Sequence, residues 1–124
     1  MRPRSATLTP QELEIMKVVW QKGDVTVRDV YETLLERRRI AYTSVMTMMK
    51  ILEGKGHLRR RREERAFVYR ATRPKAAVVR SMVREFVDRV FNGSAQPLLV
   101  HLVKDRRLTE EELDEVTRLI KGSE

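Results

Sequence analysis

Cysteine is absent from this 124-residue sequence, and histidine occurs only twice. Without cysteine, the chain can form no disulfide, no thiol redox switch and no cysteine metal site. His57 and His101 have no second histidine at metal-ligand spacing, and no glycine-rich phosphate loop occurs. No pattern of nucleophile and acid surrounds either histidine. We therefore expect no enzymatic activity, no bound metal and no cofactor.

Long apolar runs and aromatic residues are also scarce. No stretch approaches the roughly 18 apolar residues of a membrane-spanning helix, so we expect no membrane insertion. The N-terminal segment is basic but lacks an apolar h-region, so we expect no secretory signal and a cytoplasmic location. Binding to a membrane surface would need a basic amphipathic helix with exposed Trp or Phe, whereas the single Trp20 lies in an apolar helical stripe.

The net charge of +8 is confined to one part of the chain. Residues 1–73 contain 17 Lys or Arg and 9 Asp or Glu, whereas residues 74–124 contain nine of each. A chain of this length fits one domain, or a small domain with an appendage. A basic part joined to a neutral part indicates two tasks, with contact to a polyanion in the first. We therefore predict a nucleic-acid-binding domain over residues 1–73 and a second domain over residues 74–124.

Two helices near the N-terminus are predicted by capping boxes followed by apolar stripes. Thr9 precedes Glu12 by three residues, and Gly23 marks the end of the first helix. Thr26 and Asp29 repeat the same pattern at the start of the second helix. The arginines at 37–39 are typical of the negative end of a helix dipole, so we expect the second helix to extend to them.

A third helix is predicted over residues 40–56, where apolar residues recur at helical spacing. Short hydroxylated residues at the front of a helix are an ordinary structural feature. They are also side chains that can lie close to base edges in the major groove of DNA. The residues that lie off the apolar face are Thr43, Ser44, Met46, Thr47 and Lys50.

Residues 58–71 predict a short β-hairpin that turns near Glu63 and Glu64. Three helices followed by a basic hairpin is the order of a winged helix-turn-helix domain, in which the third helix enters the major groove and the wing follows the backbone. Because side chains alternate along a strand, the consecutive arginines at 59–62 cannot all face one phosphate strand. Some of them are expected to point to solvent or to pair with the two glutamates. We expect at least two of the following to contact phosphate: Arg60, Arg61, Arg62 and Arg65.

The C-terminal part predicts further helices with more apolar surface than fifty residues can bury alone. A helix is expected from Pro74, a break at 92–94, an apolar run at 97–103 that includes His101, and a capped helix after Thr109. A helical dimerisation module is the simplest explanation, and folding back onto the N-terminal domain is the alternative. The predicted dimer interface consists of Val79, Val83, Phe86, Val90, Leu98, Leu99, Leu102, Leu113, Val116 and Ile120.

Five segments in order resemble the penicillinase repressor (BlaI/MecI) family. They are "LTPQELEIMKVVW", "TVRDVYETL", "AYTSVMTMMKILEGKGHL", "RAFVYRA" and "LVHLVKDRRLTEEELDEV", and together they span nearly the whole chain. The resemblance implies a mainly α fold with a small β-hairpin wing, made of an N-terminal winged helix-turn-helix domain and a C-terminal helical dimerisation domain.

The resemblance also implies a function, that of a transcriptional repressor that binds dyad-symmetric operators as a homodimer. Such repressors often lie in operons with a membrane sensor metalloprotease whose signal leads to repressor cleavage. Family members of this kind are cut in the helix that matches "PLLVHLV", where the aligned pair is His101-Leu102, so this bond is the candidate proteolytic site. By position, the residues that face the bases are Thr43, Ser44, Met46 and Thr47. A related copper-responsive branch uses a C-terminal cysteine cluster, which this chain lacks.

A basic RNA-binding or ribosome-associated protein is the alternative function. It would share the positive charge of the first 73 residues. Sequence-specific RNA modules usually expose aromatic side chains on a sheet, however. Here Phe67 and Tyr69 are better used to hold the hairpin against the core. Competition between duplex DNA and structured RNA separates the two functions.

Overall fold

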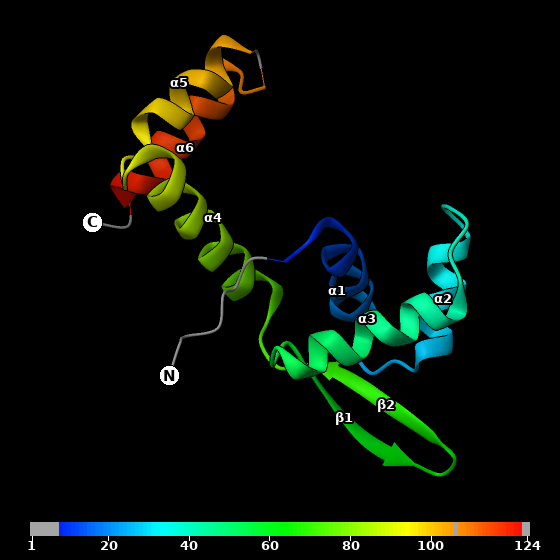
Figure 1. Ribbon diagram of the computed structural model, residues 1–124. Coiled ribbons are helices and arrows are strands. Elements are labelled where there is room, and N and C mark those ends of the chain that lie inside the picture. The colour runs from blue at the N-terminus through cyan, green and yellow to red at the C-terminus, as the bar shows by residue number, and fades with distance from the viewer. Residues whose placement is uncertain (1–7, 106, 123–124) are drawn as a thin grey trace. The chain divides into compact units, whose positions relative to one another are not determined.

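The computed structural model describes residues 8–105 and 107–122, with side chains described up to Leu119. The chain divides into two compact units, one up to Met82 and the other from Val83 onward. Figure 1 shows helices α1 to α3, a projecting hairpin and the start of α4 in the first unit, and the following helices in the second. The mainly α fold with a β-hairpin, predicted from the sequence, is confirmed.

Helices α1 (Pro10–Lys22) and α2 (Val27–Leu35) begin at the predicted caps. The Thr9 hydroxyl accepts a hydrogen bond from the Glu12 N–H at 3.1 Å, and the Glu12 carboxylate accepts one from the Thr9 N–H at 2.8 Å. Thr26 and Asp29 form the same reciprocal pair. These bonds satisfy backbone donors that the first helical turn leaves without partners.

The predicted extension of α2 to the arginines at 37–39 is wrong. The helix ends at Leu35, and no basic residue lies in its last turn. Arg37 and Arg38 instead donate their backbone N–H groups to the Leu34 carbonyl in a turn that leads to α3 (Tyr42–Gly54). Leu34, which is 1% exposed, anchors the start of this turn in the core.

The core of the first unit lies between the three helices and the root of the hairpin. Its largest buried side chains include Ile15 and Met16 of α1, Met49 of α3 and Tyr69 of the hairpin. Val78, from the first turns of α4 (Lys75–Phe91), belongs to the same core. The packed unit therefore continues beyond the charge boundary at residue 73.

An ion pair between the exposed Lys55 and the buried Glu12 ties the end of α3 to the start of α1. The Lys55 Nζ lies 2.8 Å from the Glu12 Oε2, and Glu12 is 4% exposed. Burial favours the neutral carboxyl, but the hydrogen bond from Lys55 and the one from the Thr9 backbone outweigh it and hold the pKa of Glu12 below its ordinary value. The capping glutamate therefore also fixes where α3 ends relative to α1.

The hairpin consists of β1 (Leu58–Glu63) and β2 (Ala66–Ala71), paired from Leu58 with Ala71 to Glu63 with Ala66. The turn consists of Glu64 and Arg65, one residue later than the expected Glu63 and Glu64. Glu64 adopts a left-handed conformation with φ of 55°. Val25, in the α1–α2 connection, pairs with Tyr69 through two backbone hydrogen bonds of 2.7 and 3.0 Å. This pairing attaches the hairpin to the helices.

The second unit contains the second half of α4, then α5 (Gln96–Lys104) and α6 (Glu110–Gly122). The predicted break after α4 is confirmed, since Asn92 and Gly93 both have positive φ angles. The predicted cap of α6 is confirmed by reciprocal hydrogen bonds of 3.1 Å between Thr109 and Glu112.

Candidate nucleic-acid interface

Helix α3 presents a short polar face to solvent. Thr43, Thr47 and Lys50 follow one another at spacings of four and three residues, so they share one side of the helix, and all three are exposed. Val45 and Met49 point into the core and fix the rotation of the helix about its axis. Ser44 is exposed beside this face, and Met46 is half-buried. The sequence therefore located this face correctly as the one that points away from the core.

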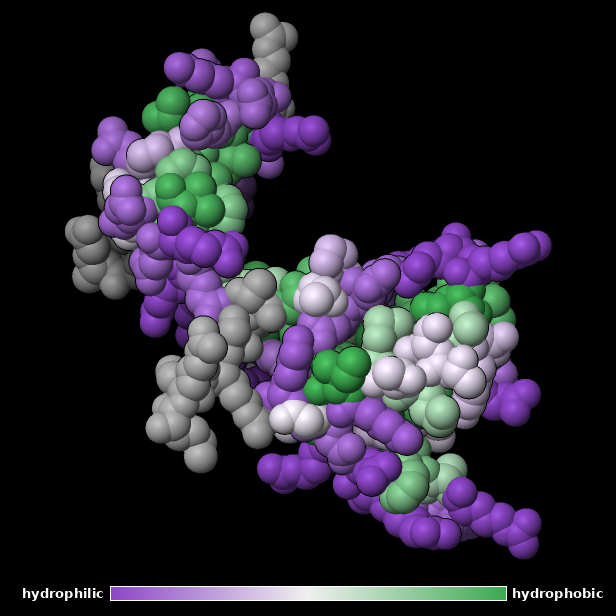
Figure 2. All heavy atoms as spheres, in the orientation of Figure 1, coloured by the Kyte–Doolittle hydropathy of each residue, from purple (hydrophilic) through white to green (hydrophobic). Residues whose placement is uncertain are grey.

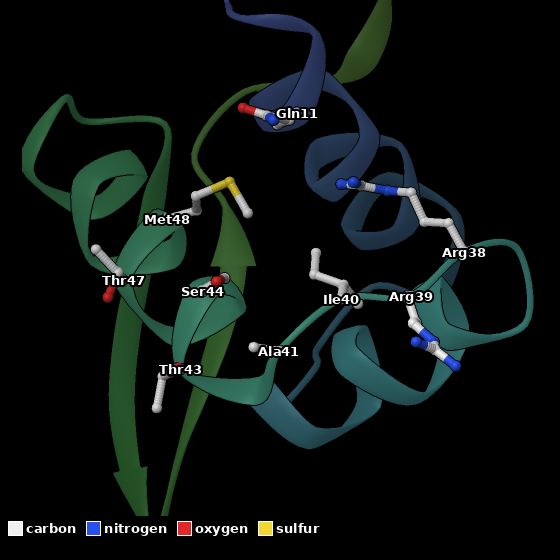
Figure 3. Close-up of a pocket in the computed structure, with 9 residues that line it drawn as sticks. All are labelled: Gln11, Arg38, Arg39, Ile40, Ala41, Thr43, Ser44, Thr47 and Met48. Carbon is white, nitrogen blue, oxygen red and sulfur yellow. The ribbon is translucent and has the colours of Figure 1, made fainter.

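A hollow of about 590 Å³ flanks the first turns of this helix (Figure 3). Thr43, Ser44 and Thr47 line one side, and Arg38 and Arg39 extend from the connection on the other side. The residues that complete the lining are Gln11, Ile40, Ala41 and Met48. Because α2 ends early, the two arginines lie beside the polar face of α3 rather than at the end of a helix. The sequence reasoning missed this placement.

A groove of about 510 Å³ lies on the other side of α3, between it and the hairpin. Its cationic lining residues are Arg28, Lys50, Arg60 and Arg65, and its apolar lining includes Met46 and Phe67. Cations around an apolar floor suit a sugar–phosphate strand, which has charged oxygens outside and carbon-rich sugars within. Arg28, at the start of α2, was not predicted as a DNA-binding residue, because the capping box of Thr26 and Asp29 already explained the sequence around it.

The four predicted wing arginines differ in their surroundings. Arg60 pairs with Glu53 of α3 at 3.2 Å, and its guanidinium stacks 4.1 Å from the centre of the Phe67 ring. Arg61 pairs with both Asp24 and Glu63 at 3.0 Å. Pairing with Glu63 confirms the expectation that one arginine binds a turn glutamate.

Arg62 and Arg65, by contrast, lie towards the end of the hairpin, where Figure 2 shows hydrophilic side chains. The Arg62 guanidinium lies 5.9 Å from the centre of the Phe67 ring. Within residues 8–105 and 107–119, no acidic side chain forms an ion pair with either arginine. Their charges are therefore available to an external anion.

Helix α4 carries an apolar stripe that begins in the first unit and continues into the second. Val79, Val83, Phe86 and Val90 recur at spacings of four, three and four residues, and each is at least 38% exposed. Figure 2 shows hydrophobic side chains reaching the surface of this unit among charged ones. The other predicted interface residues, Leu98, Leu99, Leu102, Leu113 and Val116, are half-buried, and the side chain of Ile120 lies outside the described residues.

The candidate cleavage pair lies within α5. His101 is exposed and Leu102 is half-buried, and the His101 ring lies 6.2 Å from that of Phe91. No residue of α5 is fully buried in the protomer. The apolar run at 97–103 is thus half-covered by its own chain.

Neither a metal site nor a membrane span is found in the described part of the chain. No group of three or more His, Cys, Asp or Glu residues there is placed to hold a metal ion. None of the helices that the structure describes is both long enough and apolar enough to cross a bilayer.

Helices α1 to α3, the hairpin that follows and the two flanking cationic hollows define a winged helix-turn-helix DNA-binding domain. The sequence profile of the penicillinase repressor family matches residues 8–122, and the chain belongs to that family. It is a DNA-binding transcriptional repressor, in a family of repressors rather than enzymes.

Two relatives illustrate the family likeness. The transcriptional regulator BlaI of Mycobacterium tuberculosis is 33% identical over 111 residues, covering 88% of this chain and 79% of that protein. The penicillinase repressor of Bacillus licheniformis is 25% identical over 113 residues, covering 91% of this chain and 88% of that protein.

Two solved structures resemble the N-terminal unit. The DNA-binding domain of the repressor BlaI in solution superposes with a TM-score of 0.54 at 27% identity, covering 60% of this chain and 92% of that one. The monomeric form of Bacillus licheniformis BlaI in complex with the blaP half-operator gives a TM-score of 0.50 at 28% identity, covering 56% of this chain and 85% of that one.

Proposed function

We propose that this repressor acts as a homodimer on a dyad-symmetric operator, with one α3 helix in the major groove of each half-site. The observation that carries the proposal is the exposed polar face of α3 between two hollows lined by cations. Polar side chains on a helix read base edges, and flanking cations hold the phosphates on either side. The Bacillus licheniformis relative binds a half-operator in its monomeric form, which supports one half-site for each protomer.

The residues proposed to face the bases are Thr43, Ser44, Met46, Thr47 and Lys50. Their short or flexible side chains allow the helix to approach the groove closely. Phosphate contacts are proposed for at least two of the wing arginines Arg60, Arg61, Arg62 and Arg65. Phosphate contacts set affinity and register but carry little sequence information, so the two groups have different tasks.

Dimerisation is proposed to use the C-terminal part, residues 74–124, with residues 1–73 binding DNA. The stripe of Val79, Val83, Phe86 and Val90 is the feature that supports it, because a contiguous exposed apolar surface is typical of an interaction site. A two-fold dimer places its recognition helices in symmetric half-sites, so the operator should mirror that symmetry.

Release of the operator is proposed to follow cleavage of α5 near His101-Leu102 by a membrane sensor metalloprotease encoded nearby. We propose that both operator binding and cleavage of the repressor take place in the cytoplasm. A protease binds an extended peptide, so α5 must open locally before it is cut. Because no residue of α5 is fully buried in the protomer, local opening of α5 breaks fewer contacts than the opening of a buried helix would.

Selection of bound sequences from a library of random duplexes tests the proposal. We expect an inverted repeat with half-sites about 10 bp apart from centre to centre, or a multiple of that distance. An unlabelled structured RNA should compete weakly with the selected duplex. A single unrepeated motif would contradict the dimeric arrangement, and stronger competition by RNA would favour the RNA-binding alternative.

A further inference from the structure

The hairpin has two faces with different electrostatic surroundings. Cross-strand partners share a face, so the register that pairs Arg59 with Arg70 places Arg61 and Arg70 on one side. Arg60 and Arg62 lie on the opposite side with Phe67 and Tyr69, which faces α3 and the groove.

Asp24 engages two arginines of the first face at once. Its Oδ2 lies 3.0 Å from the Arg61 Nη2, and its Oδ1 lies 3.1 Å from the Arg70 Nε. Arg61 also donates to the Glu63 Oε2 from Nε at 3.2 Å and from Nη2 at 3.0 Å. The hydrogen bonds, from Arg70 first and then from Arg61, hold the pKa of Asp24 below its ordinary value, so its charge persists well below neutral pH.

The backbone fixes the carboxylate in this position. Asp24 directly precedes Val25, whose N–H and carbonyl both bond to Tyr69 on β2. Tyr69 is 2% exposed and anchored in the core, so the connection cannot move without the strand. These backbone hydrogen bonds do not involve the Asp24 side chain. The hairpin should therefore stay bonded to the α1–α2 connection when the Asp24 charge is removed by substitution.

We infer that Asp24 limits the affinity of the wing for DNA by withholding Arg61 and Arg70 from phosphates. The wing then contacts phosphate through Arg62 and Arg65, whose charges are unopposed. The inference rests on the proposed DNA-binding function and adds which arginines of the wing contact phosphate and which do not. A phosphate that recruits Arg61 must displace charge-assisted hydrogen bonds to two carboxylates, so its net gain is small.

Limiting the free charge of the wing lowers the sequence-independent part of the affinity for DNA. Each additional phosphate contact strengthens binding to every sequence equally, because phosphates are the same in all of them. If Arg61 and Arg70 were also free, the wing would hold every DNA sequence, random DNA included, more tightly. Asp24 thus keeps the sequence-independent part of the affinity low.

The test uses the full chain and a fluorescein-labelled 24-bp duplex of scrambled sequence, with anisotropy titrations between 50 and 200 mM NaCl. Asp24→Asn leaves Arg61 paired with Glu63 but releases Arg70, so it should bind this duplex about 5- to 10-fold more tightly at 100 mM, with a salt slope steeper by about 0.9. Arg61→Gln should keep the wild-type slope, whereas Arg62→Gln should flatten it by about 0.9. Adding Arg61→Gln and Arg70→Gln to Asp24→Asn should restore the wild-type slope.

Asp114→Asn, an exposed α6 position, is the control for the change in net charge and should leave the slope unchanged. A folded Asp24→Asn protein with the wild-type slope would overturn the inference. So would an Arg61→Gln slope as flat as that of Arg62→Gln, and this comparison decides the matter even if Asp24→Asn fails to fold. If the wild-type chain shows no salt-dependent binding to duplex DNA, the proposed function itself fails, which is a different result.

Discussion

Thr47 lies in the middle of the exposed face of α3, one turn after Thr43 and one turn before Lys50. Its short side chain is exposed to solvent, whereas Val45 and Met49, on the opposite face of the helix, are fully buried. The residue is therefore free to serve an external surface. Its small size sets how closely the helix backbone approaches the floor of a major groove.

Thr47→Phe should weaken binding to the selected operator by about 10- to 100-fold, since a lost base contact costs about 1–3 kcal/mol. Binding to scrambled duplex should change little, because phosphate contacts do not involve this side chain. Arg62→Gln is the matched contrast and should weaken both DNAs alike. Paired anisotropy titrations on the two duplexes measure the difference, and equal losses for Thr47→Phe would refute the assignment of α3 to base reading.

Single carboxylates also decide what each arginine of the wing can do. Arg60 and Arg61 carry the same charge as Arg62 but face Glu53 and Asp24 respectively. Exposed ion pairs of this kind contribute little to folding stability, since solvent screens them. Their effect falls instead on the charge that the wing offers to DNA.

At the scale of elements, α4 joins the two compact units and carries the apolar stripe. Val78 on one side of the helix packs into the first core, and Val87 is buried in the second unit. Val83 and Val90, on the stripe, are each 50% exposed. A single helix thus contributes to the cores of its own chain and still presents a face that this chain only half covers.

Val83→Glu should convert the dimer to a monomer at micromolar concentration. An unpaired charge buried in an interface costs about 3–5 kcal/mol, which is roughly a 10²- to 10⁴-fold weaker association. The protomer should keep its helical content, because this side chain is half-exposed before association. Light scattering after size-exclusion chromatography gives the mass.

The control for Val83→Glu is Arg84→Gln, which alters net charge by the same amount at the neighbouring exposed position. It should remain dimeric. A Val83→Glu protein that keeps the wild-type mass would show that the stripe on α4 is not the dimer interface.

At the scale of the whole molecule, tight operator binding depends on joining two DNA-binding units. Two half-sites on one dimer act as linked ligands, so the second contact forms at a high effective concentration. Separation of the protomers forfeits this avidity without changing any contact between α3 and DNA. Control by cleavage therefore needs no movement inside the DNA-binding unit.

A chain that ends at Val100 lacks half of α5 and all of α6 and mimics such cleavage. It should bind the selected operator about 10²- to 10⁴-fold more weakly than the full chain. The N-terminal unit should stay folded, because its core lies entirely before residue 83. Thermal unfolding monitored by circular dichroism checks the fold, and footprinting measures the affinity.

Fusing the truncated chain to an unrelated dimeric coiled coil should recover most of the lost affinity. This rescue separates lost avidity from damage to the DNA-binding unit. If the truncated chain alone binds the operator as tightly as the full chain, control does not run through the C-terminal helices.

Local sequence patterns alone determined the helix starts, the hairpin and the break after α4. Thr9 with Glu12, Thr26 with Asp29 and Thr109 with Glu112 each act over three residues, so no tertiary partner is needed to predict them. Charge distribution and period-2 alternation likewise depend on neighbours in the chain. These signals were sufficient for the fold class and for the exposed face of α3.

Only the tertiary structure decided the early end of α2, the place of Val78 in the first core and the partners of the wing arginines. Asp24 meets Arg61 across 37 residues and Arg70 across 46, and these separations leave no periodic trace in the sequence. The local sequence around an arginine in a run of four is the same whether its side chain faces a carboxylate or solvent. Which of them is free to bind phosphate depends on where the folded backbone places that carboxylate.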